Sequence, residues 1–182
     1  MQNYALSANQ KKNSHNLMIP YLAAFLIVLA DRVTKWMVTQ HLTPGESIPV
    51  IGDNLLRLTY VLNPGIAFGV RLIPPTFLLV FHLIASIALI IYLYYIRKQS
   101  TFLKVPLSLI LGGAIGNVID RILYGEVIDF LDADFPDFIM TRWPVFNIAD
   151  SAITIGMTIL IVYIIFQPRT QITPSTPPSI SE

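Results

Sequence analysis

Four apolar stretches, each close to 20 residues long, dominate this chain of 182 residues. They cover residues 17–38, 77–96, 102–122 and 148–166. An α-helix needs about 20 apolar residues to cross the hydrocarbon core of a bilayer. The composition agrees, because 54% of the residues are hydrophobic and only 13% are charged. We therefore predict an all-α membrane protein in which four transmembrane helices form one bundle.

Lysine and arginine gather at one end of these predicted spans. The residues are Lys11, Lys12, Arg97, Lys98, Lys104 and Arg169. Loops rich in Lys and Arg remain in the cytoplasm, so both termini are predicted to be cytoplasmic. The outer loops, 39–76 and 123–147, are longer and hold most of the carboxylates.

Polar segments flank the membrane domain, which we place at residues 17–166. The first 16 residues and the Pro-, Ser- and Thr-rich tail at 167–182 are predicted to be disordered cytoplasmic ends. We interpret the first span as an uncleaved anchor and not as a cleaved signal peptide, because Asp31 and Arg32 directly follow its apolar core.

The first outer loop contains a strand pattern. Leu56, Leu58, Tyr60 and Leu62 alternate with Arg57, Thr59, Val61 and Asn63. This period of two is typical of a strand with one wet face. Asn63-Pro64-Gly65 then predicts a turn. We expect a small β-sheet resting on the outer membrane surface.

Three spans carry polar residues near their outer ends. These are Asp31 and Lys35 in the first span, Asn117, Asp120 and Arg121 in the third, and Asn147, Asp150 and Ser151 at the start of the fourth. Polar groups facing lipid would cost several kcal/mol each, so they are expected to face one another. Gly112 and Gly116 would let another helix approach the third span closely. The result is a polar pocket open to the outside.

Carboxylates are the groups in this pocket best suited to catalysis. The chain has no cysteine, its three histidines lack zinc-ligand spacing, and Ser151 has no nearby base. Two carboxylates that share a site hold a single proton between them. One can then take a proton from water while the other protonates a scissile carbonyl. Asp150 is one candidate, and Asp129 and Asp120 compete as its partner.

Structural roles are open for several of these residues. Asp31 and Lys35 can form a self-neutralising i,i+4 pair, and Asp120 with Arg121 can cap and anchor a helix end. Asn is a favoured N-cap residue, so Asn147 can begin the fourth helix. Asp150 would gain from the dipole of that helix. These explanations work one at a time but do not explain why the groups meet at one depth.

The motifs together resemble the lipoprotein signal peptidases, the signal peptidase II family. The motifs are Asp31-Arg32-Val33-Thr34-Lys35, Asn63-Pro64-Gly65-Ile66-Ala67-Phe68, the segment 112–121, Val127-Ile128-Asp129-Phe130 and Phe146-Asn147-Ile148-Ala149-Asp150-Ser151. The resemblance implies an aspartic endopeptidase of the bacterial cytoplasmic membrane with its site near the outer face. Members remove the signal peptide from prolipoproteins, cutting before a diacylglyceryl-modified cysteine.

The resemblance also implies roles for particular residues. The catalytic dyad carries over to Asp129 and Asp150. Residues expected to support the site or bind substrate are Asn63, Gly65, Asn117, Asp120, Arg121, Asn147, Asp31 and Lys35. An ion pair between Asp120 and Arg121 would suit structure better than proton transfer. The family's outer loop forms a β-cradle, in agreement with the predicted strand. The expected partners are lipid-modified signal peptides and membrane lipids, and not nucleic acid. No metal and no other cofactor is expected. The protein is expected to be a monomer.

Two alternatives belong to other functional classes. A small ion-coupled transporter or channel subunit would also use intramembrane carboxylates, but it predicts an acidic path across the membrane. The inner halves of the second and fourth spans contain no carboxylate, and no inverted repeat is visible. A non-catalytic assembly factor would use the polar faces only for helix contacts, and predicts no turnover.

Overall fold

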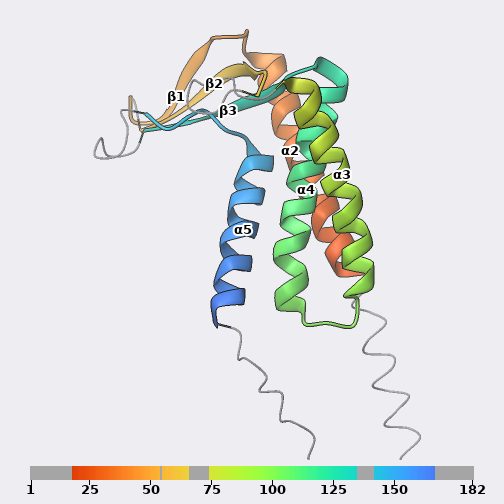
Figure 1. Ribbon diagram of the computed structural model, residues 1–182. Helices are drawn as coiled ribbons and strands as arrows, with labels where there is room; N and C mark the ends of the chain where they lie inside the picture. The colour runs from red at the N-terminus through yellow and green to blue at the C-terminus, as the bar shows by residue number, and fades with distance from the viewer. Residues whose placement is uncertain (1–17, 54, 66–73, 135–141, 167–182) are drawn as a thin grey trace, which may run out of the picture.

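The computed structural model describes residues 18–53, 55–65, 74–134 and 142–166. Its four long helices lie side by side, with a small sheet across one end (Figure 1). The helices are α2 (Met18–His41), α3 (Pro75–Tyr95), α4 (Thr101–Tyr124) and α5 (Ile148–Phe166). The predicted spans agree with them to within a few residues. The two ends predicted to be disordered lie outside the described residues.

Three of these helices, α3, α4 and α5, are long and apolar enough to cross a membrane. α2 is as long as α4 but carries Asp31, Arg32 and Lys35 within its length. Large apolar side chains on the outer helix faces are exposed in the isolated chain, as with Ile84 at 62%. A water-soluble bundle would bury such a surface, whereas a bilayer covers it with lipid. The chain is therefore a multi-pass membrane protein.

Local sequence sets where the helices begin and end. Pro75 occupies the first turn of α3, where its missing N–H costs no helical hydrogen bond. Ser100 caps α4 by accepting a hydrogen bond from the backbone N–H of Phe102 at 3.2 Å. Gly125 ends α4 in the left-handed conformation, with φ of 78°. α4 therefore stops two residues before the strand that contains Asp129.

Helix α4 is the centre of the bundle and packs against each of the other three helices. Its glycines allow this close approach. A Cβ atom on Gly112 would lie 2.7 Å from the backbone oxygen of Ala24 in α2. A Cβ atom on Gly116 would lie 2.7 Å from a carboxylate oxygen of Asp31. The close contact predicted from the two glycines is confirmed, and it places α2 against the polar end of α4.

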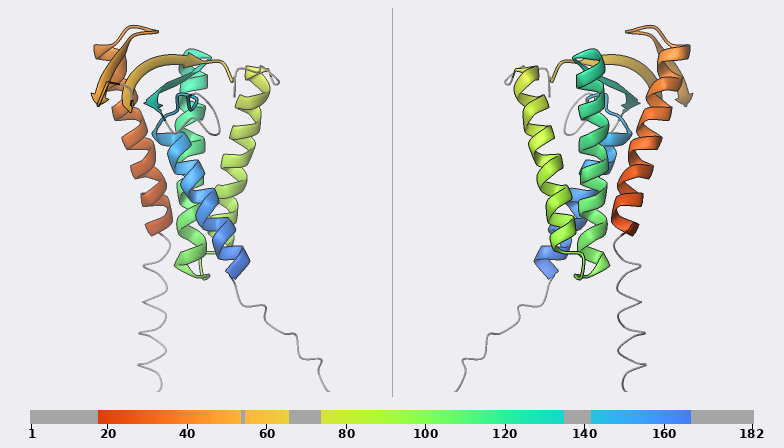
Figure 2. Two further views of the ribbon diagram at one scale, coloured as in Figure 1. Left: turned by 90° about the vertical axis from the view of Figure 1, so that its left-hand side faces the viewer. Right: turned by 90° about the vertical axis from the view of Figure 1, so that its right-hand side faces the viewer.

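The sheet has three antiparallel strands in the order β1 (Ser47–Ile51), β2 (Leu56–Asn63) and β3 (Val127–Ala133). Figure 2 shows it at the end of the bundle where α4 stops and α5 begins, opposite the start of α2 and the end of α5. The sequence predicted only the middle strand. β1 contains a proline, and four of the first five residues of β3 are apolar, so neither strand shows the alternation expected of a strand with one wet face.

The predicted alternation of β2 holds only in its first half. Leu58 and Tyr60 pack against an apolar cluster of Val38, Leu42 and Phe130. A bulge between Leu58 and Val61 then shifts the register against β3. An extra residue in one strand moves the following side chains to the opposite face. Consequently Leu62 is 37% exposed, and Asn63 instead turns toward β3.

Candidate active site

Asp150 lies in the first turn of α5, where it takes part in a reciprocal cap with Asn147. The side-chain oxygen of Asn147 accepts a hydrogen bond from the backbone N–H of Asp150 at 2.9 Å. In return, the backbone N–H of Asn147 donates to Asp150 Oδ2 at 3.3 Å. This is a capping-box arrangement with aspartate three residues after the cap. The cap predicted for Asn147 is present, and it fixes the orientation of the Asp150 carboxylate.

Asp129 lies in β3 and is 1% exposed. Two side-chain amides hold its carboxylate, because Asn147 Nδ2 donates to Oδ1 at 2.7 Å and Asn63 Nδ2 donates to Oδ2 at 2.8 Å. Val61 pairs with Asp129 across the sheet, so Asn63, two residues further on, is a diagonal neighbour on the same face. The bulge in β2 is thus what brings Asn63 to Asp129.

Gly65 fixes the orientation of the Asn63 amide. Its backbone N–H donates to Asn63 Oδ1 at 2.9 Å, which leaves Nδ2 to face Asp129. Gly65 has a φ of 100°, a conformation that favours glycine. A Cβ atom there would also collide with the side chain of Leu78. The predicted turn therefore has a direct consequence for the geometry of the site.

Burial raises the pKa of the Asp129 carboxyl to about 7, and the negative charge of Asp150 adds to the effect. The hydrogen bonds from Asn63 and Asn147 and the charge of Lys35 oppose this rise. Amides can orient a carboxylate without adding a positive charge. The surroundings of Asp129 therefore let it hold a proton near neutral pH while its position stays fixed.

The two carboxylates are linked through the asparagines. Asn117 Nδ2 donates to Asp150 Oδ1 at 2.7 Å, and Asn147 Nδ2 lies 3.3 Å from Asn117 Oδ1. Asn147 thus contacts Asp129 with its side chain and Asp150 with its backbone. Helices α4 and α5 and strand β3 all contribute to this group. We call Asp129 and Asp150 the dyad.

Four buried or half-buried charges lie beside the dyad and form what we call the ion quartet. Its members are Asp31, Arg32, Lys35 and Asp120. Lys35 Nζ lies 2.9 Å from Asp31 Oδ2 and 2.6 Å from Asp120 Oδ2, and Arg32 contacts both carboxylates as well. The ion pair predicted between Asp31 and Lys35 is confirmed. Arg32 was not among the residues predicted to support the site, although a third charge within a span was a signal for it.

The predicted ion pair between Asp120 and Arg121 is wrong. Asp120 pairs with Arg32 and Lys35 and accepts a hydrogen bond from the backbone N–H of Ile128 at 3.2 Å. Arg121 donates instead to the backbone oxygen of Asn117 at 3.3 Å, and its electrostatic interactions are, in falling order, with Asp150, Asp129 and Asp120. Consecutive residues of a helix point about 100° apart and do not face each other. Asp120 therefore faces α2, whereas the largest electrostatic interactions of Arg121 are with the dyad.

Asp31 has a second contact that the sequence did not indicate. Its Oδ1 accepts a hydrogen bond from the backbone N–H of Ala149 at 3.1 Å. An acidic side chain at a helix N-terminus satisfies a free N–H and interacts favourably with the helix dipole. A residue of α2 therefore helps to fix the start of α5, one residue before Asp150.

Comparisons with known proteins agree with this geometry. The family profile described as signal peptidase (SPase) II matches residues 23–166. The chain belongs to the signal peptidase II family. It is 44% identical to the lipoprotein signal peptidase of Halalkalibacterium halodurans over 84% of this chain and 95% of that protein. It is 41% identical to that of Chlorobium phaeobacteroides over 79% of this chain and 93% of that protein.

The fold is similar to that of solved bacterial membrane enzymes. One of them superimposes with a TM-score of 0.70 at 32% identity and covers 85% of this chain and 94% of its own. A second gives a TM-score of 0.69 at 34% identity, with 82% and 94% covered. Membership of the signal peptidase II family makes this protein a peptidase, and hence a hydrolase involved in lipoprotein processing.

In this signal peptidase II family member, one ion pair partly explains the acidic segment between α4 and α5. Asp132 accepts hydrogen bonds from Thr59 Oγ1 and Arg142 Nε, both at 2.6 Å. Burial alone would raise the pKa of Asp132, but the bonds from Arg142 and Thr59 outweigh it and lower that pKa. Arg142 thereby ties the segment before α5 to the sheet. Asp137, another carboxylate of the predicted loop 123–147, lies outside the described residues.

Proposed function

We propose that this protein is an aspartic endopeptidase that uses Asp129 and Asp150 as its catalytic dyad. The observation that carries the proposal is the sharing of Asn147 between the two carboxylates. Its Nδ2 donates to Asp129 Oδ1 at 2.7 Å, and its backbone N–H donates to Asp150 Oδ2 at 3.3 Å. Two carboxylates fixed around one residue are suited to sharing a single proton.

In the proposed reaction one carboxyl of the dyad is protonated and the other is ionised. The ionised carboxylate takes a proton from a water molecule, whose oxygen attacks the peptide carbonyl, while the protonated carboxyl donates its proton to the carbonyl oxygen. The C–N bond of the tetrahedral intermediate then breaks. The nitrogen receives a proton from the carboxyl that took one from water, and a hydroxyl of the intermediate returns a proton to the other carboxylate as the carbonyl re-forms. The pKa of Asp129, raised to about 7, supports Asp129 as the proton donor in the first step.

The proposed substrate is a bacterial prolipoprotein whose cysteine carries a diacylglyceryl group, cut on the N-terminal side of that cysteine. Support comes from the relatives, which are named lipoprotein signal peptidases. Acyl chains buried in the bilayer would fix the depth of the scissile bond and reduce the orientational cost of reaction. The start of α5, whose first turn holds Asp150, lies at the sheet end of the helices (Figure 1). The proposed dyad would therefore meet that bond near the membrane surface.

The same proposal includes the arrangement in the membrane. Residues 17–166 form the peptidase domain of a monomer, and α2 to α5 cross the bacterial cytoplasmic membrane. Both ends of the chain then lie in the cytoplasm, and the sheet and the dyad lie at the outer face. The positive residues near the inner ends of the helices support this orientation. The exposed Trp36 and Trp143 at the other end suit the outer interface.

The test is cleavage of a purified diacylglyceryl-modified precursor by the purified protein and its variants. Asp129→Asn and Asp150→Asn are each expected to stay folded and to lose cleavage. Asp132→Asn is the matched control, because it removes a carboxylate from the same strand and is expected to retain cleavage. Full activity of either dyad variant would remove that residue from the dyad. If only Asp120→Asn loses cleavage, Asp120 and not Asp129 is the partner of Asp150. If the unaltered protein does not cleave the precursor, a non-catalytic role is favoured.

A further inference from the structure

Lys35 lies one amide group away from the dyad, and its contacts are complete. The residue is 1% exposed. Its ammonium contacts Asp31 and Asp120 at 2.9 Å and 2.6 Å and donates to Asn117 Oδ1 at 3.2 Å. An ammonium group has three donors and no acceptor, so these contacts use all three. The contacts with Asp31 and Asp120 belong to the ion quartet, whereas the contact with Asn117 connects Lys35 to the dyad.

The contact with Asn117 determines which end of that amide faces Asp150. Asn117 Oδ1 lies near two donors, Lys35 Nζ and Asn147 Nδ2 at 3.3 Å. Because an ammonium cannot accept a hydrogen bond, the oxygen must face Lys35. The Asn117 Nδ2 group then points the other way and donates to Asp150 Oδ1 at 2.7 Å. Without Lys35 the amide could rotate and present its oxygen to the carboxylate.

Lys35 also sets the charge beside the dyad. The ion quartet contains two carboxylates and two cations, so it is neutral. Loss of the Lys35 charge would leave the quartet with a net negative charge next to two more carboxylates. Buried charges interact strongly because the surroundings have a low dielectric constant. Among the described residues, His82 of α3 interacts electrostatically with Asp150, Arg121 of α4 with Asp150, Asp129 and Asp120, and Tyr60 of β2 with Asp120.

We propose that Lys35 is a positioning residue of the dyad, which it serves in two ways. Its ammonium orients the Asn117 amide toward Asp150, and its charge keeps Asp129 and Asp150 sharing one proton instead of taking up a second. The inference rests on the proposed function and deepens it. It differs from a purely structural role because it requires the protonation of the dyad to depend on Lys35.

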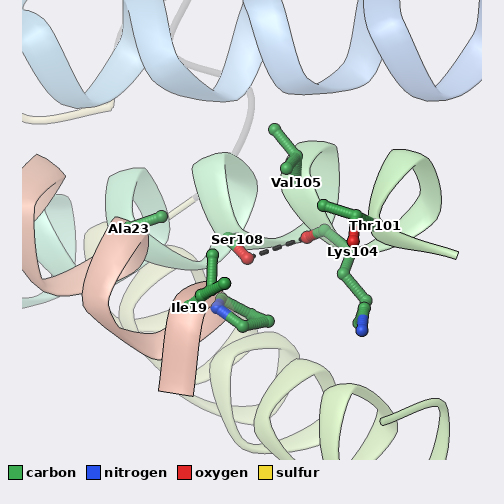
Figure 3. Close-up of a pocket in the computed structure, with 7 residues that line it drawn as sticks. Ile19, Ala23, Thr101, Lys104, Val105 and Ser108 are labelled. Atoms are coloured by element: carbon green, nitrogen blue, oxygen red, sulfur yellow. Dashed lines mark hydrogen bonds between the residues drawn. The ribbon is translucent and has the colours of Figure 1, made fainter. Parts of the chain in front are cut away.

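Three substitutions separate the two contributions. Lys35→Gln keeps an N–H donor but removes the charge, Lys35→Met removes both, and Lys35→Arg keeps both in another shape. The matched control is Lys104→Met. Lys104 is also 1% exposed, but it lies at the opposite end of α4 and donates to the backbone oxygen of Arg97 at 3.1 Å. Figure 3 shows Lys104 at a small pocket between α2 and α4.

The first measurement is the pH profile of kcat/KM for cleavage of the diacylglyceryl-modified precursor. In Lys35→Gln and Lys35→Met both limbs of the profile are expected to move to higher pH by on the order of one unit, the effect of removing a nearby opposite charge from a carboxyl pair. Lys35→Arg should keep the limbs of the unaltered protein at a lower kcat. Lys104→Met should keep both the limbs and kcat.

The second measurement does not need activity. Infrared difference spectra of protein labelled with 13C at the aspartate carboxyls give the titration of Asp129, assigned as the band lost in Asp129→Asn. Its midpoint is expected to rise in Lys35→Gln. If the unaltered protein fails to cleave but the midpoint rises, only the proposed function fails. If it cleaves and neither the midpoint nor the limbs move, only the role of Lys35 fails. Loss of the folded state in both uncharged variants would overturn the inference in favour of a structural ion pair.

Discussion

Replacing Asp129 with asparagine should make the folded protein less stable in acid and more stable at alkaline pH. The pKa of Asp129 is raised to about 7 in the folded protein, chiefly by burial. The unfolded value is about 3.9, so the folded state binds more protons between these values and stability falls as pH rises. Over roughly three pH units, at about 1.4 kcal/mol each, the loss is on the order of 4 kcal/mol.

Asparagine at position 129 removes this loss but introduces another cost. Both oxygens of Asp129 accept hydrogen bonds from amide groups, Asn147 Nδ2 and Asn63 Nδ2. The new side chain has one oxygen and one NH2 group, so one donor faces another donor. An unsatisfied buried polar group costs about 1–3 kcal/mol. At pH 4 the variant shows only the cost of the unsatisfied donor, so it is less stable than the unaltered protein. Above pH 8 the variant is the more stable, because the unaltered protein has lost more stability through ionisation of Asp129. The stability curves of the two proteins are expected to cross between about pH 5 and 6.

The assay is thermal unfolding of both purified proteins in the same detergent from pH 4 to pH 9. Asp132→Asn is the control of opposite sign, because hydrogen bonds from Arg142 and Thr59 lower the pKa of Asp132. Its carboxylate stabilises the folded protein above its unfolded pKa, and this contribution is lost as pH falls through the folded value. Asp132→Asn should therefore be destabilised at neutral pH and approach the unaltered protein in acid. Parallel curves for Asp129→Asn and the unaltered protein would refute the account of Asp129.

Substitutions at three further positions test other contacts. Asn147→Ala should lower the free energy of unfolding by about 1 kcal/mol through the lost helix cap, and it should also abolish cleavage. Asn147→Asp should retain the cap and still lose cleavage. Thermal unfolding and the cleavage assay, measured on both variants, separate the two effects. Gly65→Ala should lower the cleavage rate at least tenfold, because the strained turn and the collision with Leu78 would displace Asn63. A normal cleavage rate would show that Asn63 does not position Asp129. Arg142→Gln should change the unfolding free energy little, because the Arg142 side chain is 38% exposed and water screens its ion pair with Asp132. A large drop in unfolding free energy would contradict this.

The parts of the fold that the sequence predicted are those with a strong local signal. Apolar length located all four helices, and Asn147 marked the start of α5 through its capping preference. Alternation located β2 but not its bulge, because an extra residue in a strand depends on the partner strand and leaves no period in the sequence. The strand containing Asp129 was missed, because residues buried on both faces lose the alternation that marks a half-buried strand.

The site was predictable as a set of residues but not as a set of pairs. Depth in the membrane indicated which polar groups meet. The partner of each group depends on the rotation of one helix against another, which apolar length does not encode. Asp120 illustrates this, since sequence proximity suggested Arg121 and helix geometry gave Arg32 and Lys35. The contact from Asp31 to the backbone N–H of Ala149 joins residues 118 positions apart and has no local signal.

The proposed reaction explains why amides touch Asp129 while no cation among the described residues does. A cation bound directly to this carboxylate would favour its charged form and displace the proton that the proposed reaction needs. The amides of Asn63 and Asn147 orient the oxygens at a smaller electrostatic cost. Lys35 supplies the positive charge from further away, because the Asn117 amide lies between its ammonium and Asp150. In this account the distance from Lys35 to the dyad sets the protonation of the dyad, whereas the hydrogen bonds from the amides fix its geometry. Protonation and geometry can therefore be altered separately by substitution.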